Sequence, residues 1–191
     1  MTITIHHDPH AESPREWDNL GTMLCNHRRY DLGDKSNPEA GEHGSYKADF
    51  IAYLKSENLT LSDVIYTPIY MYNHSGISLS SESFSCNWDS GQLGWHYVTK
   101  SKIRAEFNVK RISPKLYQTV IDILNNELEL YNHYVQGNCY GFIIKDDEGD
   151  QIDSCWGFIG ELNEVKESMY EHIDSNLWEQ IETIDYSDII Y

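Results

Sequence analysis

Three aspartates near tryptophans are the first candidates for catalytic chemistry. Asp18 and Asp89 each follow a tryptophan directly, and Asp153 precedes one by three positions. If the fold brings these carboxylates together, they form a metal or carboxylate site with His96 as the acid–base group. Aspartates in such places also form turns by accepting hydrogen bonds from nearby backbone N–H groups. The residue pattern favours turns and keeps a small metal-dependent hydrolase or ligand-binding protein as the alternative.

Motifs of well-known enzyme classes are missing. The sequence contains no Gly-x-Ser-x-Gly nucleophile elbow and no glycine-rich phosphate-binding loop. No cysteine has the local signature of a catalytic nucleophile. The sequence therefore predicts no catalytic residue, no bound metal and no cofactor, and it argues against an enzyme.

The strongest chemical signal is the uneven distribution of charge. Residues 121–191 hold 17 acidic and 2 basic side chains, a net formal charge of −15 out of −17 for the whole chain. Within residues 161–184 apolar residues recur every three or four positions, which predicts one amphipathic helix packed on a core. The carboxylates on the flank of this helix are the first predicted partner-binding residues: Glu161, Glu164, Glu167, Glu171 and Asp174.

A second acidic cluster precedes that helix. The cluster consists of Asp146, Asp147, Glu148, Asp150 and Asp153, and its first four members are also predicted to bind the partner. The segment lacks the twelve-residue pattern of an EF-hand calcium loop. We therefore expect it to be a hairpin turn between two strands.

Three interpretations of this acidity remain open. The carboxylates are solvated surface groups that keep the protein soluble, or they bind cations, or they imitate the phosphates of a nucleic acid. Duplex DNA carries about one negative charge per 1.7 Å of its axis, and carboxylates at helical spacing present a comparable row to a protein that binds phosphates. Like charges three or four residues apart repel by a few tenths of a kcal/mol, so stability alone does not favour the arrangement.

Length and composition predict one domain covering residues 1–191. The 14 tyrosines and 5 tryptophans supply large side chains for a core. The first residues lack the features of a signal peptide, and no apolar run is long enough for a membrane span. We therefore expect a cytoplasmic protein with reduced thiols, including Cys139 and Cys155. The oligomeric state is not indicated.

The order of expected elements predicts an α+β fold, with a mainly antiparallel sheet and helices packed on one face. Pro68 interrupts the clearest strand and places it at an edge or a bulge. The strands are expected at residues 2–5, 63–73, 77–79, 95–98, 139–144 and 151–158. The helices are expected at residues 46–58, 101–107, 114–136 and 161–184.

Arg28 and Arg29 form the one pair of adjacent arginines in the chain. Nearby acids such as Glu16 and Asp31 are candidate partners. The sequence therefore predicts a structural salt-bridge cluster in this region.

Three motifs carry a resemblance to a known group of proteins. They read ESPREWDNLGTM at residues 12–23, FSCNWDSGQLG at residues 84–94 and DSCWGF at residues 153–158. In this order, over nearly the whole chain, they resemble a family of small acidic proteins of bacteriophages and mobile elements. No reaction is attached to that family, so the resemblance implies no catalytic residue. It implies a phage accessory protein that acts inside a bacterium.

This resemblance gives the acidic surface a functional context. Small acidic phage proteins often block host proteins that bind DNA or RNA, such as restriction enzymes or CRISPR effectors, although this is analogy without regard to fold. We therefore expect a non-enzymatic inhibitor whose acidic face occupies the basic channel of a host nucleic-acid-binding protein. A phage structural or assembly component is a further alternative. Direct binding to nucleic acid or to a membrane is not expected, because like charges repel.

Overall fold

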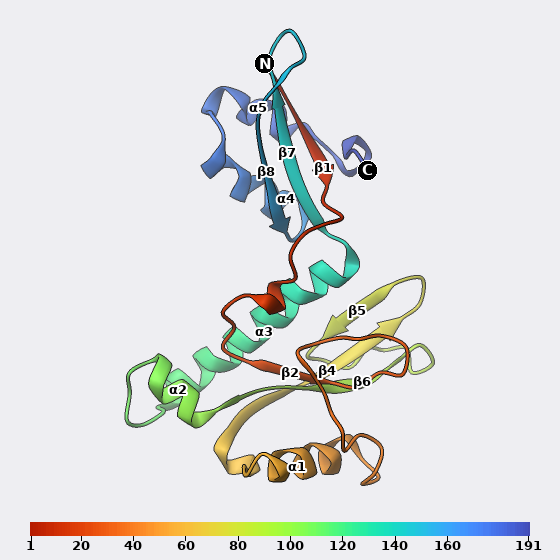
Figure 1. The fold of residues 1–191 in the computed structure, drawn as a ribbon, viewed down its shortest axis with the longest axis vertical. Helices are drawn as coiled ribbons and strands as arrows, with labels where there is room; N and C mark the ends of the chain where they lie inside the picture. Colours follow the sequence, from red (N-terminus) through yellow and green to blue (C-terminus); the bar gives the residue numbers. More distant parts are fainter. The chain divides into compact units, whose positions relative to one another are not determined.

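The computed structural model describes the whole chain, residues 1–191, and its contacts group the residues into two compact units (Figure 1). Unit 1 consists of Met1–Pro14 and His133–Tyr191, and unit 2 consists of Arg15–Asn132. The sequence predicted one domain. The two units arise because the two ends of the chain pair with each other, and each unit buries hydrophobic clusters of its own. The predicted α+β class is confirmed.

Unit 1 contains a three-stranded antiparallel sheet in the order β1-β7-β8. Its strands are β1 (Thr2–His7), β7 (Cys139–Lys145) and β8 (Gln151–Ile159). Apolar residues of β1 alternate with polar ones, so that one face of the strand is buried with β7 and the other is not. The predicted strands at both ends of the chain are therefore confirmed.

The segment expected to be one helix over residues 161–184 is broken in the structure. It forms α4 (Leu162–Met169) and α5 (Trp178–Glu182), joined by the 3-10 turns Tyr170–His172 and Ser175–Leu177. The backbone is extended at Ile173, with φ −132° and ψ 154°. A continuous helix would be about 36 Å long, whereas a strand the length of β7 spans about 23 Å.

The break therefore lets both halves pack on a short sheet. The apolar residues that suggested one helix do enter the core of unit 1: Leu162, Val165, Met169, Leu177 and Ile181 are buried. They pack with residues of β1 and β7 such as Ile5 and Phe142. The periodicity correctly identified the buried residues and incorrectly predicted a single rod.

Unit 2 contains a five-stranded mixed sheet in the order β3-β2-β6-β4-β5. Its strands are β2 (Thr22–Cys25), β3 (Lys35–Ser36), β4 (Val64–Asn73), β5 (Ile77–Ser80) and β6 (Ser90–Thr99). Only β3 runs parallel to its neighbour. Pro68 lies where β4 pairs with β6 alone, because pairing with β5 begins at Tyr70, directly after a register shift. The expectation that Pro68 marks an edge or a bulge is confirmed.

Helices cover both faces of this sheet (Figure 1). Helix α1 (Tyr46–Ser56) packs through Phe50 on the face that contains Val64 and Tyr97. Helices α2 (Lys100–Glu106) and α3 (Pro114–Gln136) pack on the opposite face. Neighbouring strand residues enter different clusters because side chains alternate across a strand, and this arrangement differs from the predicted single helical layer.

The remaining short helical turns are Pro14–Glu16, Leu61–Asp63 and Tyr186–Asp188. All four cysteines are free, as expected. Cys139 pairs in register with Ile159, and Cys155 pairs with Phe142, so the two thiols of the hairpin are not opposite each other. None of the helices combines the length and the apolar character needed to cross a membrane.

Candidate functional site

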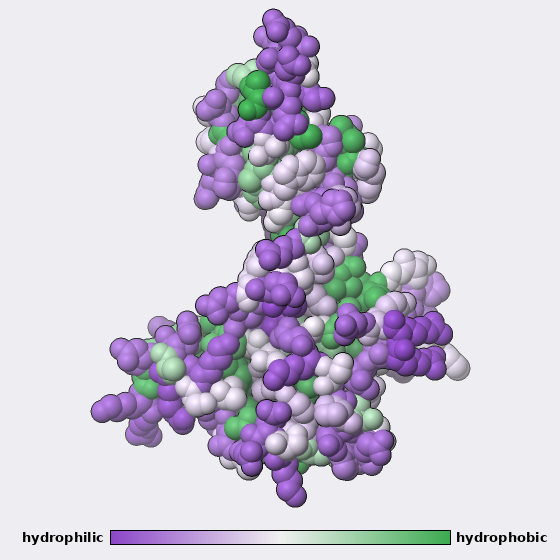
Figure 2. All heavy atoms as spheres, in the orientation of Figure 1, coloured by the Kyte–Doolittle hydropathy of each residue, from purple (hydrophilic) through white to green (hydrophobic).

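Unit 1 carries nearly all the excess negative charge of the protein. It holds 16 acidic and 2 basic side chains, a net formal charge of −14, whereas unit 2 holds 15 and 12. Lys166 is buried, and its Nζ donates to the backbone oxygen of Glu182 at 3.4 Å. No lysine or arginine of unit 1 forms an ion pair with a carboxylate of that unit. Figure 2 shows mostly hydrophilic residues on the visible face of this unit.

The first group of carboxylates belongs to α4. Glu161 is the N-cap residue, and Glu164 and Glu167 follow at intervals of three. All three are exposed, whereas Val165 and Met169 of the same helix are buried. Successive members advance by about 4.5 Å along the helix axis, compared with about 3.4 Å per charge along one strand of DNA. Only two contacts engage this group, from Tyr186 Oη at 2.9 Å and from His133 Nδ1 at 3.9 Å, both to Glu161.

The second group surrounds a hollow of about 330 Å³. Glu171 and Asp174 line it from the segment between α4 and α5, and Asp153 lines it from β8. Its apolar wall consists of Ile144, Ile152, Ile173 and Leu177. Asp153 therefore lies beside Glu171 and Asp174, in agreement with its place in the acidic cluster that precedes α4 in the sequence.

The third group is the turn between β7 and β8. The predicted hairpin turn is confirmed, because Asp146 Oδ1 accepts the N–H groups of Glu148 at 3.0 Å and of Asp150 at 2.9 Å. Carboxylate oxygens of these three residues lie within 4.8 Å of one another. The terminal amine of Met1 pairs with Asp147, and Met1 also lines the hollow. The turn and the hollow are therefore neighbours on one surface.

We use the name acidic surface for these three groups of carboxylates together; the turn and the start of α4 lie at opposite ends of the β7–β8 hairpin. Their members are Asp146, Asp147, Glu148, Asp150, Asp153, Glu161, Glu164, Glu167, Glu171 and Asp174. Nine of them were predicted partner-binding residues. Such a surface attracts cationic groups and offers several carboxylates at once.

The alternative catalytic set does not assemble. Asp153 belongs to unit 1 and accepts the N–H of Ser154 at 2.8 Å, while the other three residues belong to unit 2. Within unit 2, no hydrogen bond or ion pair joins Asp18, Asp89 and His96 to one another. Asp89 faces His74 at 3.3 Å, whereas His96 is fully buried beside Glu127. These contacts fit the local structural roles that the residue pattern favoured.

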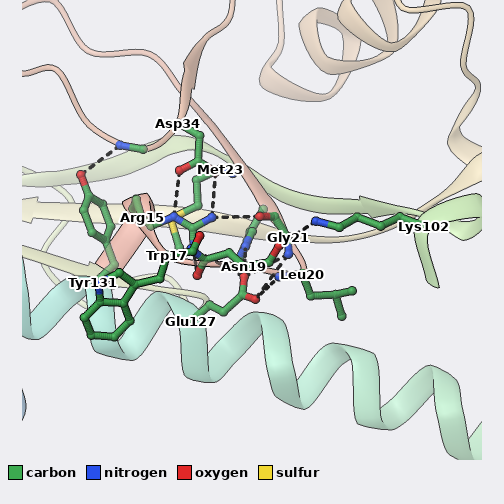
Figure 3. Close-up of polar contacts among 12 residues, drawn as sticks. Arg15, Trp17, Asn19, Leu20, Gly21, Met23, Asp34, Lys102, Glu127 and Tyr131 are labelled. Carbon is green, nitrogen blue, oxygen red and sulfur yellow. Dashed lines mark hydrogen bonds and ion pairs between the residues drawn. The ribbon is translucent and has the colours of Figure 1, made fainter. Parts of the chain in front are cut away.

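A buried polar network in unit 2 explains the first motif (Figure 3). The side chain of Arg15 is only 5% exposed, and its guanidinium binds both carboxylate oxygens of Asp34 at 2.8 and 2.7 Å. The same group reaches Glu127 Oε2 at 3.4 Å and the backbone oxygen of Gly21 at 2.9 Å. Arg15 therefore connects the start of unit 2 to the loop after β2 and to α3.

Glu127 is the second centre of this network. It accepts the backbone N–H groups of Leu20 at 2.6 Å and of Gly21 at 3.1 Å, and its Oε2 lies 3.0 Å from Nε2 of His96. Burial raises the pKa of Glu127, but the contacts with His96, Leu20 and Arg15 outweigh this effect and hold the pKa below its ordinary value. The network is a structural connection, and sequence analysis missed it because its members lie far apart in the chain.

The third motif contains a β-bulge. Trp156 pairs with Gly141 and Phe158 pairs with Tyr140, so Gly157 is the extra residue, with φ of +88°. Its N–H donates to Asp8 Oδ2 at 3.1 Å. The tryptophan and the glycine of the motif are thus accounted for by local geometry.

Comparisons with protein-family models, with curated proteins and with solved structures find no match for this chain. The resemblance carried by the three motifs therefore stays a prediction.

Proposed function

We propose that the protein is a non-enzymatic binding protein whose acidic surface imitates the phosphates of a nucleic acid. The observation that carries this proposal is the charge balance of unit 1. This unit contains 16 acidic and 2 basic side chains, and neither basic side chain forms an ion pair. Carboxylates that serve only stability are more often interleaved with bases. Rows of carboxylates without neighbouring basic side chains favour binding of a cationic partner.

The partner in this proposal is a protein that binds nucleic acid through lysine and arginine side chains in a basic channel. Glu161, Glu164 and Glu167 support this choice, because they repeat a negative charge at regular intervals along α4, as phosphates do along a DNA strand. The hollow beside Glu171 and Asp174 adds an apolar wall for the stem of a long basic side chain. Complementary charge speeds the encounter and makes the affinity sensitive to salt.

The biological context of the proposal comes from the resemblance to phage proteins. In that setting the protein acts in the cytoplasm of a bacterial host and inhibits a defence protein of the restriction or CRISPR type. Inhibition would follow from occupation of the channel, without chemistry on the partner.

The test uses two variants with the same total charge. The first replaces Glu164, Glu167 and Glu171 with Gln and Asp174 with Asn. The control replaces four exposed acids of unit 2 with Gln: Glu57, Glu82, Glu106 and Glu129. The immobilised parent chain and both variants are incubated with lysate of a bacterial host, and bound nucleic-acid-binding proteins are challenged with duplex DNA.

The proposal expects the parent chain and the control to retain a nucleic-acid-binding protein that duplex DNA displaces. The unit 1 variant should retain none. Raising the salt from about 0.1 M to about 1 M shortens the screening length from about 10 Å to about 3 Å and should release the partner. Equal retention by both variants would refute the proposal.

A further inference from the structure

Unit 2 contains a hollow of about 420 Å³ with a chemistry opposite to that of the acidic surface. Arg28 and Arg29 line it from the loop after β2, and the ends of β4 and β6 supply other walls. The volume falls within the range of small-ligand sites, about 300–1,000 Å³. The sequence predicted that both arginines pair with nearby acids, but the structure shows no ion pair for either guanidinium, which corrects that prediction.

Several contacts hold this loop in place, and none of them involves the guanidinium group of Arg28 or Arg29. The N–H of Asn26 donates to the backbone oxygen of Leu93 at 3.0 Å, which fixes the start of the loop on β6. His27 stacks on Tyr30, with ring centroids 4.9 Å apart and planes at 14°. Asn73 Nδ2 of β4 donates to Tyr30 Oη at 3.4 Å. Arg28 and Arg29 are therefore positioned by the backbone and by their neighbours.

Aromatic side chains line the same hollow. Trp88 is 96% exposed and lies in the segment before β6, and Tyr46 is 47% exposed at the start of α1. An indole with almost its whole surface in water contributes little to a core and is available for stacking on a planar ligand. A site with two free guanidinium groups and an exposed indole suits a ligand that combines a phosphate with a flat ring.

We propose that this hollow binds a nucleotide, with Arg28 and Arg29 on the phosphate and Trp88 stacked on the base. We call it the arginine–tryptophan hollow. The shared chemistry is a nucleoside 5′-phosphate, either free or at the end of a single strand. Asn26, Asn73 and Gln92 also line the hollow, and in this proposal their amide groups supply hydrogen bonds to the base or the sugar. This inference does not depend on the acidic surface of unit 1.

One carboxylate lies close to the proposed site. Asp89 lines the hollow, but its Oδ2 lies 3.3 Å from Nδ1 of His74 and also accepts from Cys86 Sγ at 3.9 Å. The hollow is lined by two arginines and by one carboxylate, which already contacts His74. The lining therefore carries a net positive charge. Charges more than about 8 Å away are largely screened at physiological salt, so the net charge of the chain does not exclude a small anion here.

The experiment is calorimetric titration of the full chain with adenosine monophosphate, adenosine and inorganic phosphate. A double variant changes Arg28→Gln and Arg29→Gln. The matched control changes Lys110→Gln and Arg111→Gln, an exposed basic pair elsewhere in unit 2 that also has no ion pair. A third variant, Trp88→Ala, removes the stacking surface. Circular dichroism checks that each variant is folded.

The proposal expects adenosine monophosphate to bind more tightly than adenosine or phosphate alone. Loss of both arginines should weaken its binding by about tenfold or more, and the control should bind it as the parent chain does. Trp88→Ala should weaken binding of the nucleotide and leave binding of inorganic phosphate unchanged. Absence of binding by the parent chain, or equal losses in the two double variants, would overturn the proposal.

A 5′-phosphorylated oligothymidylate and its unphosphorylated form distinguish the two sources of the ligand. Tighter binding of the phosphorylated strand than of thymidine monophosphate identifies the end of a strand, and the reverse order identifies a free nucleotide. Both results support the shared chemistry. Equal binding of the phosphorylated and unphosphorylated strands would contradict it.

Discussion

Nε2 of His96 lies 3.0 Å from Oε2 of Glu127, and the imidazole has no exposed surface. The same carboxylate holds the backbone of Leu20 and Gly21, and it also contacts Arg15. One side chain of α3 therefore organises the entry of the chain into unit 2. The sequence suggested His96 as an acid–base group together with Asp18, Asp89 and Asp153. In the structure it instead belongs to this buried network.

Replacing Glu127 with Gln should destabilise unit 2. The change removes one charge from a buried pair with Arg15 and weakens the contacts with backbone N–H groups, and breaking such a pair costs about 3 kcal/mol. Urea denaturation of the full chain measures the loss. The control Glu129→Gln alters an exposed neighbour on the same helix and should change stability by less than about 0.5 kcal/mol. Similar losses in the two variants would contradict the network.

The stabilisation from Glu127 should also depend on pH. The pKa of this carboxyl lies below its ordinary value of 4.5 in the folded protein, so its contribution is complete above that value and is lost as the pH falls through the folded pKa. The difference in unfolding free energy between the parent chain and Glu127→Gln should therefore shrink on acidification. Denaturation series at about pH 7 and about pH 3.5 test this. If the difference in unfolding free energy between the two proteins were larger at the lower pH, the prediction would be contradicted.

Gly21→Ala should be strongly destabilising. A Cβ at this position would overlap Nε2 of His96 and Cδ2 of Leu124, both of which are fully buried. Overpacking of a core costs about 1–3 kcal/mol. Thermal unfolding compares this variant with Gly76→Ala, whose added methyl group would meet no atom within 4 Å. If Gly21→Ala is as stable as the control, the close approach of these side chains is not as described.

Asp8→Ala should loosen the bulge in β8. Asp8 is 9% exposed, and its carboxylate accepts the N–H groups of His10 at 3.0 Å and of Gly157 at 3.1 Å. Gly157 is exposed, so its freed amide can bond to water, and the expected loss is that of one hydrogen bond, about 0.5–1.5 kcal/mol. Hydrogen exchange should become faster at Gly157 and remain unchanged in α1 of unit 2. Unchanged exchange at Gly157 would show that Asp8 does not hold the bulge.

Local patterns in the sequence predicted most elements, because each has a local cause. Pro114 begins α3, and Gly137, with φ of +81°, follows its last residue. The alternation in residues 2–5 identified β1. The division into two units could not be predicted in this way, because it depends on the pairing of β1 with β7 across more than 130 residues.

The carboxylates of the acidic surface could be identified from composition and helical spacing, but their geometry could not. The extended backbone at Ile173 ends the predicted helix and places Glu171 and Asp174 beside Asp153. The arginine–tryptophan hollow was missed for a different reason. Nothing in the local sequence shows that Arg28 and Arg29 lack partners or that Trp88 is exposed.

The central claim is that the acidic surface of unit 1 is where the partner binds. Hydrogen exchange of the protein, alone and in complex with the captured nucleic-acid-binding protein, tests it most directly. The claim predicts slower exchange in residues 146–153 and 161–174 of the complex, with unit 2 unchanged. Slower exchange confined to unit 2 would contradict it.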